Sequence, residues 1–298
     1  MTPPEQNPTD SIAAIARALL YEGYVLWPYR RSVAKNQRRW TLGGVFPRAY
    51  SEAGHADDAW LMRTECLVQA EAGATFDVTV RLLHVVDRAV ARVVDGVATF
   101  ADSITIGDET FLAWEEAVER EVIVPTIYLG TDEPLHVRVP VEFPGGESNE
   151  QLRDADDTVA GLLVRRWKGI AGFVDVYRIR LLPGVYKLCV DITNTSPWNG
   201  EPRQQVLRRT FVSTHSVLHV VRGELVSLVD PPRALSALSA QCENIGTWPV
   251  LVGNAARRDT VLSSPIILSD YPEVATESST DFFDRAEGDE PLVAGPSP

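Results

Sequence analysis

The stretch GFVDVYRIRLLPGVYKLCVDIT, residues 172–193, decides the fold class of this sequence. Two apolar-rich segments flank the dipeptide Pro183-Gly184, which is typical of tight turns. After the turn, apolar side chains alternate with polar ones, as they do in a strand that buries one face. The stretch therefore predicts a β-hairpin, with Tyr186, Leu188, Val190 and Ile192 on the buried face and Lys187, Cys189 and Asp191 on the other.

Strand-like segments continue on both sides of this hairpin. A second hairpin is predicted over residues 206–229, with its turn at Arg222-Gly223, and an Asp95-Gly96 turn is predicted earlier in the chain. Residues 111–120 fit a short helix or a strand. Repeated strands with few helical periods predict a mainly β protein, an antiparallel β-sandwich-like architecture with a few short helices. The other predicted strands are residues 76–82, 90–94, 98–106, 122–129 and 135–143.

The chain divides into three regions by composition. Residues 1–59 combine a predicted helix with an aromatic and basic segment, and we expect them to pack on the body of the protein. Residues 60–150 and 151–298 are both expected to be β-rich, the second with a motif-dense C-terminal segment and a disordered tail. The polar stretch 144–157 predicts an exposed loop or a connection between domains, so a boundary near residue 150 is expected, although one domain fits as well.

Composition and charge bear on the classes of partner. The formal charge of −13, from 28 basic and 41 acidic side chains, disfavours a nucleic-acid partner. No apolar run approaches the ~20 residues of a membrane-spanning helix, and the first residues do not form a signal sequence, so we expect no membrane span and a cytoplasmic location. Three cysteines that are isolated in sequence predict no disulfide framework. We expect no metal and no cofactor, because neither a ligand cluster nor a glycine-rich phosphate loop is present.

Two segments near the ends of the chain are candidate contact surfaces for a partner protein. The first interleaves aromatic rings with guanidinium groups, and the second sets two adjacent rings between carboxylates. The alternatives are that the rings of the first segment pack into their own domain and that the second is a solvated tail. The candidate residues are Tyr24, Trp27, Tyr29, Arg30, Arg31, Arg39 and Trp40, and then Asp281, Phe282, Phe283 and Asp284.

No residue pattern in the chain predicts a catalytic residue. His215 and His219 lie in a strand-like segment, where residues four apart are ~13 Å from each other, so we expect two exposed or half-buried strand histidines rather than a metal pair. Cys242 needs a cationic neighbour to become a nucleophile, and a packed thiol is the alternative. An enzyme or ligand-binding reading would use a C-terminal pocket around Cys242 and Trp248, with Asp230 and Asp270.

Motifs at both ends of the chain carry a resemblance to a known family. The segments YEGYVLWPYR and KNQRRWTLGGVFPRAY come first, and SLVDPP, CENIGTWPVLVG, LSSPIILSDYPEVA and ESSTDFFD follow near the C-terminus. In this order they resemble a family of uncharacterised conserved proteins encoded alongside actinobacterial-type nickel–iron hydrogenases. The resemblance implies a non-catalytic accessory role in hydrogenase assembly or maturation, with hydrogenase subunits or maturation factors as partners.

The sequence departs from the family pattern at its C-terminal end. Residues 277–284 read ESSTDFFD, where the family pattern has Pro-Gly before the Asp, and the tail RAEGDEPL replaces a more regular acidic and aliphatic ending. If this segment docks on a partner, the departure implies weaker docking by this protein.

Overall fold

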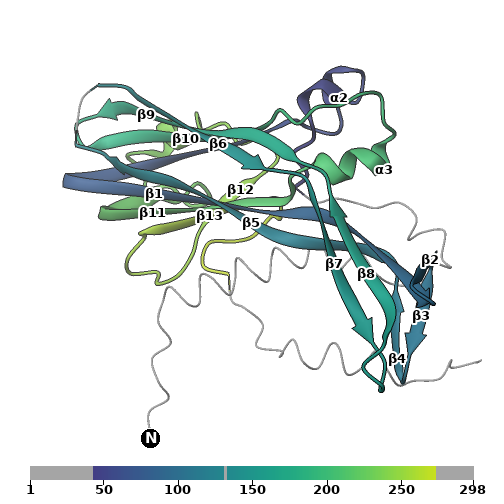
Figure 1. Ribbon diagram of the computed structural model, residues 1–298. Coiled ribbons are helices and arrows are strands. Elements are labelled where there is room, and N and C mark those ends of the chain that lie inside the picture. The colour runs from purple at the N-terminus through teal and green to yellow at the C-terminus, as the bar shows by residue number, and fades with distance from the viewer. Residues whose placement is uncertain (1–42, 131–132, 273–298) are drawn as a thin grey trace, which may run out of the picture.

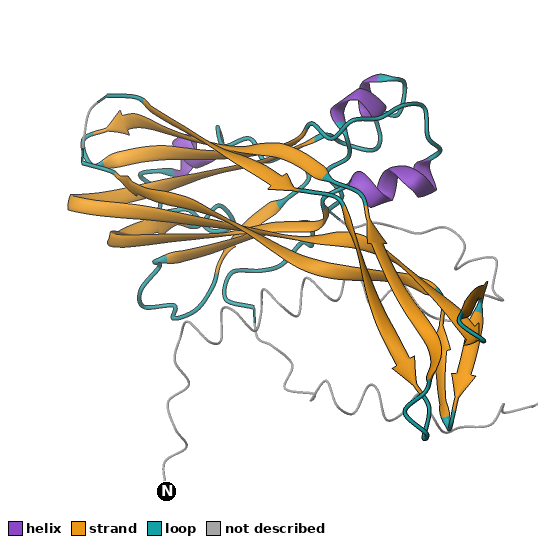
Figure 2. Ribbon diagram, viewed as in Figure 1, coloured by secondary structure: helices purple, strands orange, loops and turns teal. Residues whose placement is uncertain are grey.

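Strands dominate the structure, and the helices are short (Figure 2). The computed structural model describes residues 43–130 and 133–272. A large antiparallel sheet and a small two-stranded sheet contain all the described strands. The predicted mainly β, sandwich-like class is confirmed. The helical segments are α2 (Arg48–Glu52), α3 (Arg203–Val206), the 3-10 turn η2 (Leu207–Arg209) and α4 (Ser236–Ser239), and none of the helices in the described residues is long and apolar enough to span a membrane.

One strand, β1 (Leu61–Val94), organises the whole molecule. It has 34 residues, which at ~3.3 Å per residue makes it roughly 110 Å long along its path. Different neighbours pair with successive parts of it, so a single strand runs from the sandwich body into a projecting arm (Figure 1). In order along β1 these neighbours are β10 (Val185–Asn194), β11 (Val212–Val226), β5 (Trp114–Tyr128), β8 (Val159–Trp167) and β2 (Val97–Ala101).

The body is a two-layer sandwich. The start of β1 connects the two layers, because it pairs with both β10 and β11. In Figure 1, β9 (Ile170–Leu182), β10 and β6 (Leu135–Phe143) form the upper layer, above β5, β11, β12 (Trp248–Leu251) and β13 (Thr260–Ser264). The apolar faces of the two layers meet in one large core. Fully burying one large aliphatic or aromatic side chain in this core stabilises the fold by ~1.5–3 kcal/mol. This core includes Phe76, Val176, Leu188 and Leu218 from the facing strands, and Phe211 just before β11.

The arm is built from the ends of β1 and β5 together with β2, β7 (Gly146–Arg153) and β8. A separate hairpin of β3 (Ser103–Ile106) and β4 (Glu109–Leu112) covers part of this sheet (Figure 1). The two pack around a small apolar cluster that includes Val90, Ile104, Leu152 and Leu163. The arm therefore has a core of its own, although β1 is continuous with the body.

Local sequence signals placed two turns correctly. The hairpin at Pro183-Gly184 joins β9 to β10, and alternate residues of β10 point into the core as predicted. Asp95 and Gly96 have φ values of 51° and 76°, which are those of a two-residue hairpin turn of type I′. Residues 111–120 lie largely in β5, because residues 114–120 pair with residues 82–88 of β1.

Two predicted elements are wrong. The polar stretch 144–157 is not a loop throughout, because residues 146–153 form β7, an exposed strand that pairs with β8. The predicted hairpin at Arg222-Gly223 is also wrong. β11 continues through these residues, and Arg222, with φ 61°, lies beside an irregularity in the pairing of β11 with β1. Short helical turns, α3 and η2, occupy residues 203–209, where part of that hairpin was expected.

The strand assignment of the two histidines is correct, but their burial is not as predicted. Both lie on β11. His215 is fully buried rather than exposed or half-buried, whereas His219 is half-buried and its Nδ1 lies 3.0 Å from the hydroxyl of Thr260. The sequence shows only the alternation along β11, and residues 212–216 of that strand are buried on both faces.

Candidate functional site

The strand register of the upper layer places charged side chains in rows on its outer face. Side chains alternate between the two faces of a sheet, so residues paired across neighbouring strands share a face. The opposite face of the same strands belongs to the core. The first row is Arg138 on β6, Asp175 on β9, Asp191 on β10 and Arg63 on β1, and the next row is His136, Tyr177, Cys189 and Glu65.

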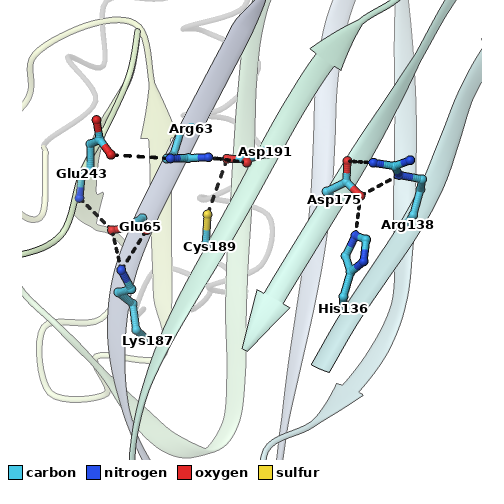
Figure 3. A network of polar contacts seen from close by, with 9 residues as sticks. All are labelled: Arg63, Glu65, His136, Arg138, Asp175, Lys187, Cys189, Asp191 and Glu243. Atoms are coloured by element: carbon cyan, nitrogen blue, oxygen red, sulfur yellow. Dashed lines mark hydrogen bonds and ion pairs between the residues drawn. The ribbon is translucent and has the colours of Figure 1, made fainter. Parts of the chain in front are cut away.

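Asp175 is held by two side chains from β6, Arg138 and His136 (Figure 3). Arg138 donates to its two carboxylate oxygens over 2.7 and 3.1 Å, and His136 Nε2 lies 2.5 Å from Oδ1. Burial by itself would raise the pKa of Asp175, but the hydrogen bonds from Arg138 and His136 outweigh it and hold that pKa below its ordinary value. Asp175 is therefore an ionised, buried anchor that orients Arg138, whose side chain is 54% exposed.

Asp191 holds Arg63 in the same way (Figure 3). Arg63 donates from Nε and Nη2 to the two oxygens of Asp191, both over 2.7 Å, and its Nη1 lies 3.5 Å from Glu243. The hydrogen bonds to Asp191 raise the pKa of Arg63 above its usual range. Cys189 donates its thiol to Asp191 over 3.5 Å. Burial and then the charge of Asp191 raise the pKa of Cys189 to about 12, so this cysteine stays a thiol at neutral pH.

A third ion pair fixes the loop that precedes β12. Lys187 Nζ lies 3.0 Å from each carboxylate oxygen of Glu65. Glu65 also accepts the backbone N–H of Glu243 over 2.8 Å and donates its own backbone N–H to Asn244 over 2.9 Å. The backbones of Arg63 and Ile245 exchange two hydrogen bonds. The CENIG segment of the C-terminal motif region therefore runs along the side of β1, next to the row of charges.

An open groove of about 370 Å³ lies over this face. Its aromatic walls are covered by cations: the guanidinium of Arg48 lies 4.3 Å from the ring centre of Trp60, and that of Arg138 lies 4.8 Å from that of Phe173. His136 stacks on Tyr177 with ring centres 4.4 Å apart. The groove thus presents Arg63 and Arg138, which buried carboxylates hold, and two guanidinium groups that lie over rings, those of Arg48 and Arg138. Its lining residues are Arg48, Trp60, Leu61, Arg63, Arg138, Phe173, Asp175, Tyr177, Asp191, Thr193 and Thr195.

The site residues predicted from sequence lie elsewhere. The N-terminal set from Tyr24 to Trp40 and the C-terminal set from Asp281 to Asp284 fall outside the described residues. None of the four residues of the alternative ligand pocket lines the groove.

The structure brings two of those four residues together. The hydroxyl of Ser227 donates to Asp270 and accepts the backbone N–H of Asp230. Cys242 instead packs, half-buried, in the apolar cluster of Leu67 and Val226, where burial and then the charge of Glu65 raise its pKa to about 11. Trp248 begins β12 opposite Ser264 and is 44% exposed. A pocket that joins all four residues stays a prediction.

Sequence reasoning missed the groove, although part of its signal was in the hairpin that it predicted. The alternation in residues 172–193 already sets Asp175 and Asp191 apart from the core-facing side chains, and a turn at residues 183–184 brings them near each other. What the sequence could not give was the pairing of β10 with Arg63 on β1 and of β9 with Arg138 on β6. Within residues 43–130 and 133–272, no three His, Cys, Asp or Glu side chains gather as a metal site requires.

Comparisons with known proteins do not assign the chain to a family. No family model matches it, and no curated protein is significantly similar. Among solved structures, it is compared with the Salmonella SPI-1 type III secretion injectisome secretin InvG in the open gate state, at 11% identity over 92% of this chain and 84% of that one, with a TM-score of 0.16. A second InvG structure gives 10% identity over 80% and 73% of the two chains, with a TM-score of 0.10. TM-scores this low carry no argument about fold or function.

Proposed function

We propose that this protein is a non-catalytic accessory protein that acts through protein–protein contacts in the assembly or maturation of a nickel–iron hydrogenase. The hydrogenase context rests on the resemblance of the terminal motifs, and its partners are hydrogenase subunits or maturation factors. The contact role rests on one observation, the open groove in which buried carboxylates hold Arg63 and Arg138 in fixed orientations.

The chemistry of the groove suits recognition of an acidic segment. A guanidinium presents five N–H donors in a planar fork, and Asp175 accepts from Nε and Nη2 of Arg138, so donors remain for a second carboxylate. Arg48 at the rim is 53% exposed and donates through Nε to Glu52, which is 51% exposed. Because these groups are already ordered, a partner carboxylate loses little of its binding free energy to arranging them.

The same contacts make two residues of the face, Asp175 and Cys189, poor catalysts. The lowered pKa of Asp175 makes it a weak base, and the raised pKa of Cys189 leaves little thiolate for nucleophilic attack. These side chains serve instead to position neighbouring cations. The net charge of the protein is −13, so most of its surface repels an acidic partner. A local cationic rim therefore favours binding of such a partner at the groove rather than elsewhere.

The test compares two arginines in matched settings. Arg48→Glu reverses the charge at the rim of the groove, and Arg153→Glu makes the same change on β7, where Arg153 is 49% exposed and is likewise paired with a carboxylate four residues on. Binding of each full-length variant to purified hydrogenase subunits and maturation factors is measured by biolayer interferometry. We expect Arg48→Glu to weaken binding at least tenfold, or about 1.4 kcal/mol, and Arg153→Glu to bind like the wild type.

Two results would count against the proposal. Failure of the wild type to bind any hydrogenase subunit or maturation factor would remove the hydrogenase context. Equal weakening by both variants would show that net charge rather than the groove governs binding. A fall in wild-type affinity with added salt that is smaller in Arg48→Glu would support a direct ionic contact at the rim.

A further inference from the structure

The outermost strand of the arm, β2, is exposed on both of its faces. Its sequence, VATFA, has no charge and no proline, and Val97 and Phe100 are 65% and 53% exposed. β2 pairs with β1 on one side, and among the described residues no strand pairs with its other edge. A short, uncharged strand of high β-propensity with an open edge is a template for pairing with another chain.

The other edge strands of the large sheet are protected against such pairing. Proline removes a ladder donor, and charged side chains disfavour an incoming strand. β5, β6 and β12 contain Pro125, Pro140 and Pro249, and β7 carries Glu147 and Glu150. Against this background, the edge of β2 stands out as the one in the described part of the large sheet that has neither protection.

The Asp95-Gly96 turn fixes which backbone groups of β2 face outward. In a hairpin with a two-residue turn, the flanking residues Val94 and Val97 form a hydrogen-bonded pair, and such pairs alternate with non-hydrogen-bonded ones. Val97, Thr99 and Ala101 therefore direct their N–H and C=O groups to β1. Ala98 and Phe100 direct theirs to the open edge.

We propose that this edge pairs with the β2 strand of a second copy of the chain, as an antiparallel two-fold dimer centred on Thr99. In this register Ala98 of one copy lies opposite Phe100 of the other, and both have outward-facing backbone groups. Two such pairs exchange four N–H···O bonds and join the two arms into one continuous sheet. The proposal goes beyond the proposed function, because it concerns the arm and not the groove.

The sequence of β2 and its flanks is complementary to itself in this register. The small Ala98 lies opposite the large Phe100, Val97 lies opposite Ala101, and the two Thr99 residues meet in a close non-hydrogen-bonded pair, a favourable cross-strand combination. The flanking Asp95 and Asp102 fall opposite Ser103 and Gly96, so no two like charges oppose each other. This charge pattern favours a second copy as the occupant.

The experiment measures the mass of the full chain by sedimentation equilibrium from micromolar to submillimolar concentration. A five-residue edge is a small interface, so we expect a reversible monomer–dimer equilibrium. Thr99→Lys sets two cations opposite each other and should abolish the dimer. The matched control, Thr110→Lys, adds the same charge to the exposed strand β4 of the same arm and should leave the dimer intact. Ala98→Pro removes an outward donor without touching the ladder to β1 and should also give a monomer.

A charge-swap mixture tests the register itself and does not depend on one variant folding poorly. Thr99→Lys and Thr99→Glu should each be monomeric alone and should form a heterodimer when mixed, because opposite charges then meet at the two-fold axis. A wild type that is monomeric over the whole range would overturn the proposal. So would a dimer that persists in Thr99→Lys, since that dimer would use another surface.

Discussion

Lowering the pH from about 7 to about 5 should destabilise this protein, chiefly through the buried side chain of His215. The imidazole is 1% exposed, and its Nδ1 lies 3.1 Å from the carbonyl oxygen of Ser213. Its Nε2 has no hydrogen-bond partner among the described residues. Burial lowers the pKa of His215 to about 4, and the hydrogen bond with Ser213 opposes this only in part. The folded protein therefore holds this histidine neutral.

The magnitude follows from the difference between folded and unfolded pKa values. An unfolded-chain histidine has a pKa of ~6.5, so below that pH the unfolded state binds a proton that the folded state does not. The free energy of unfolding then falls with pH until the folded pKa of about 4 is reached. At ~1.4 kcal/mol per pKa unit, the loss is about 2 kcal/mol at pH 5 and about 3 kcal/mol at pH 4. His84, whose pKa burial also lowers, contributes in the same direction.

Urea unfolding at about pH 7 and about pH 5 measures this loss directly, and His215→Gln should remove most of it. Stopping at pH 5 separates histidine from the carboxylates with lowered pKa values, Asp175 and Glu116, whose contributions are lost below their unfolded pKa values of ~4. His219→Gln, on the same strand, is the control and should keep the fall that His215 produces. The reasoning is refuted if His215→Gln and the wild type lose the same free energy between the two pH values.

Three further predictions concern packing, thiol chemistry and the row of charges. Gly172→Ala should lower the free energy of unfolding by at least ~3 kcal/mol. The added Cβ would lie 2.1 Å from the carbonyl oxygen of Thr193 and 2.8 Å from the ring of Phe211. Gly130→Ala is the control: its Cβ would have no atom nearer than 3.9 Å, so it should be nearly neutral in the same urea assay. Alkylation of the native protein near pH 8, followed by mass spectrometry, should be slow at Cys66, Cys189 and Cys242, since burial raises the pKa of all three thiols; rapid reaction at Cys242 alone would instead support the C-terminal pocket. Asp175→Asn should lower the free energy of unfolding by about 2 kcal/mol, because it leaves Arg138 and His136 without their buried anion. Adding Arg138→Met to this variant should recover part of the loss. Strict additivity of the two changes in the free energy of unfolding would argue against coupling between the two residues.

Local chemistry made part of the fold readable from the sequence. Pro183-Gly184 and Asp95-Gly96 place hairpin turns, because few residue types tolerate the backbone angles that such turns require. Period-two alternation then identified the buried face of β10, including Leu188 and Val190. Both signals act between residues that are close in sequence, and together they were sufficient for the mainly β class.

Those local signals did not predict the polar strand β7 or the full length of β11. β7 reads as a loop because its residues bury almost nothing, and it is a strand only because β8 supplies backbone partners. The Arg222-Gly223 pair reads as a turn, yet β11 pairs with β1 on both sides of Arg222, and its preceding residues 216–219 pair with β13, so the strand does not reverse direction there. In each case the hydrogen bonds that decide the structure come from a distant part of the chain.

The sequence by itself determined the class of fold, the two turns and the polar face of the central hairpin. The tertiary structure alone decided the groove, because its row of charges needs the registers of four strands at once, and Arg63 and Asp191 are 128 residues apart. It also decided the burial of His215 and the open edge of β2. Burial on both faces of a strand and the lack of a neighbour at its edge are properties of how strands are arranged, and no periodicity within one strand records them.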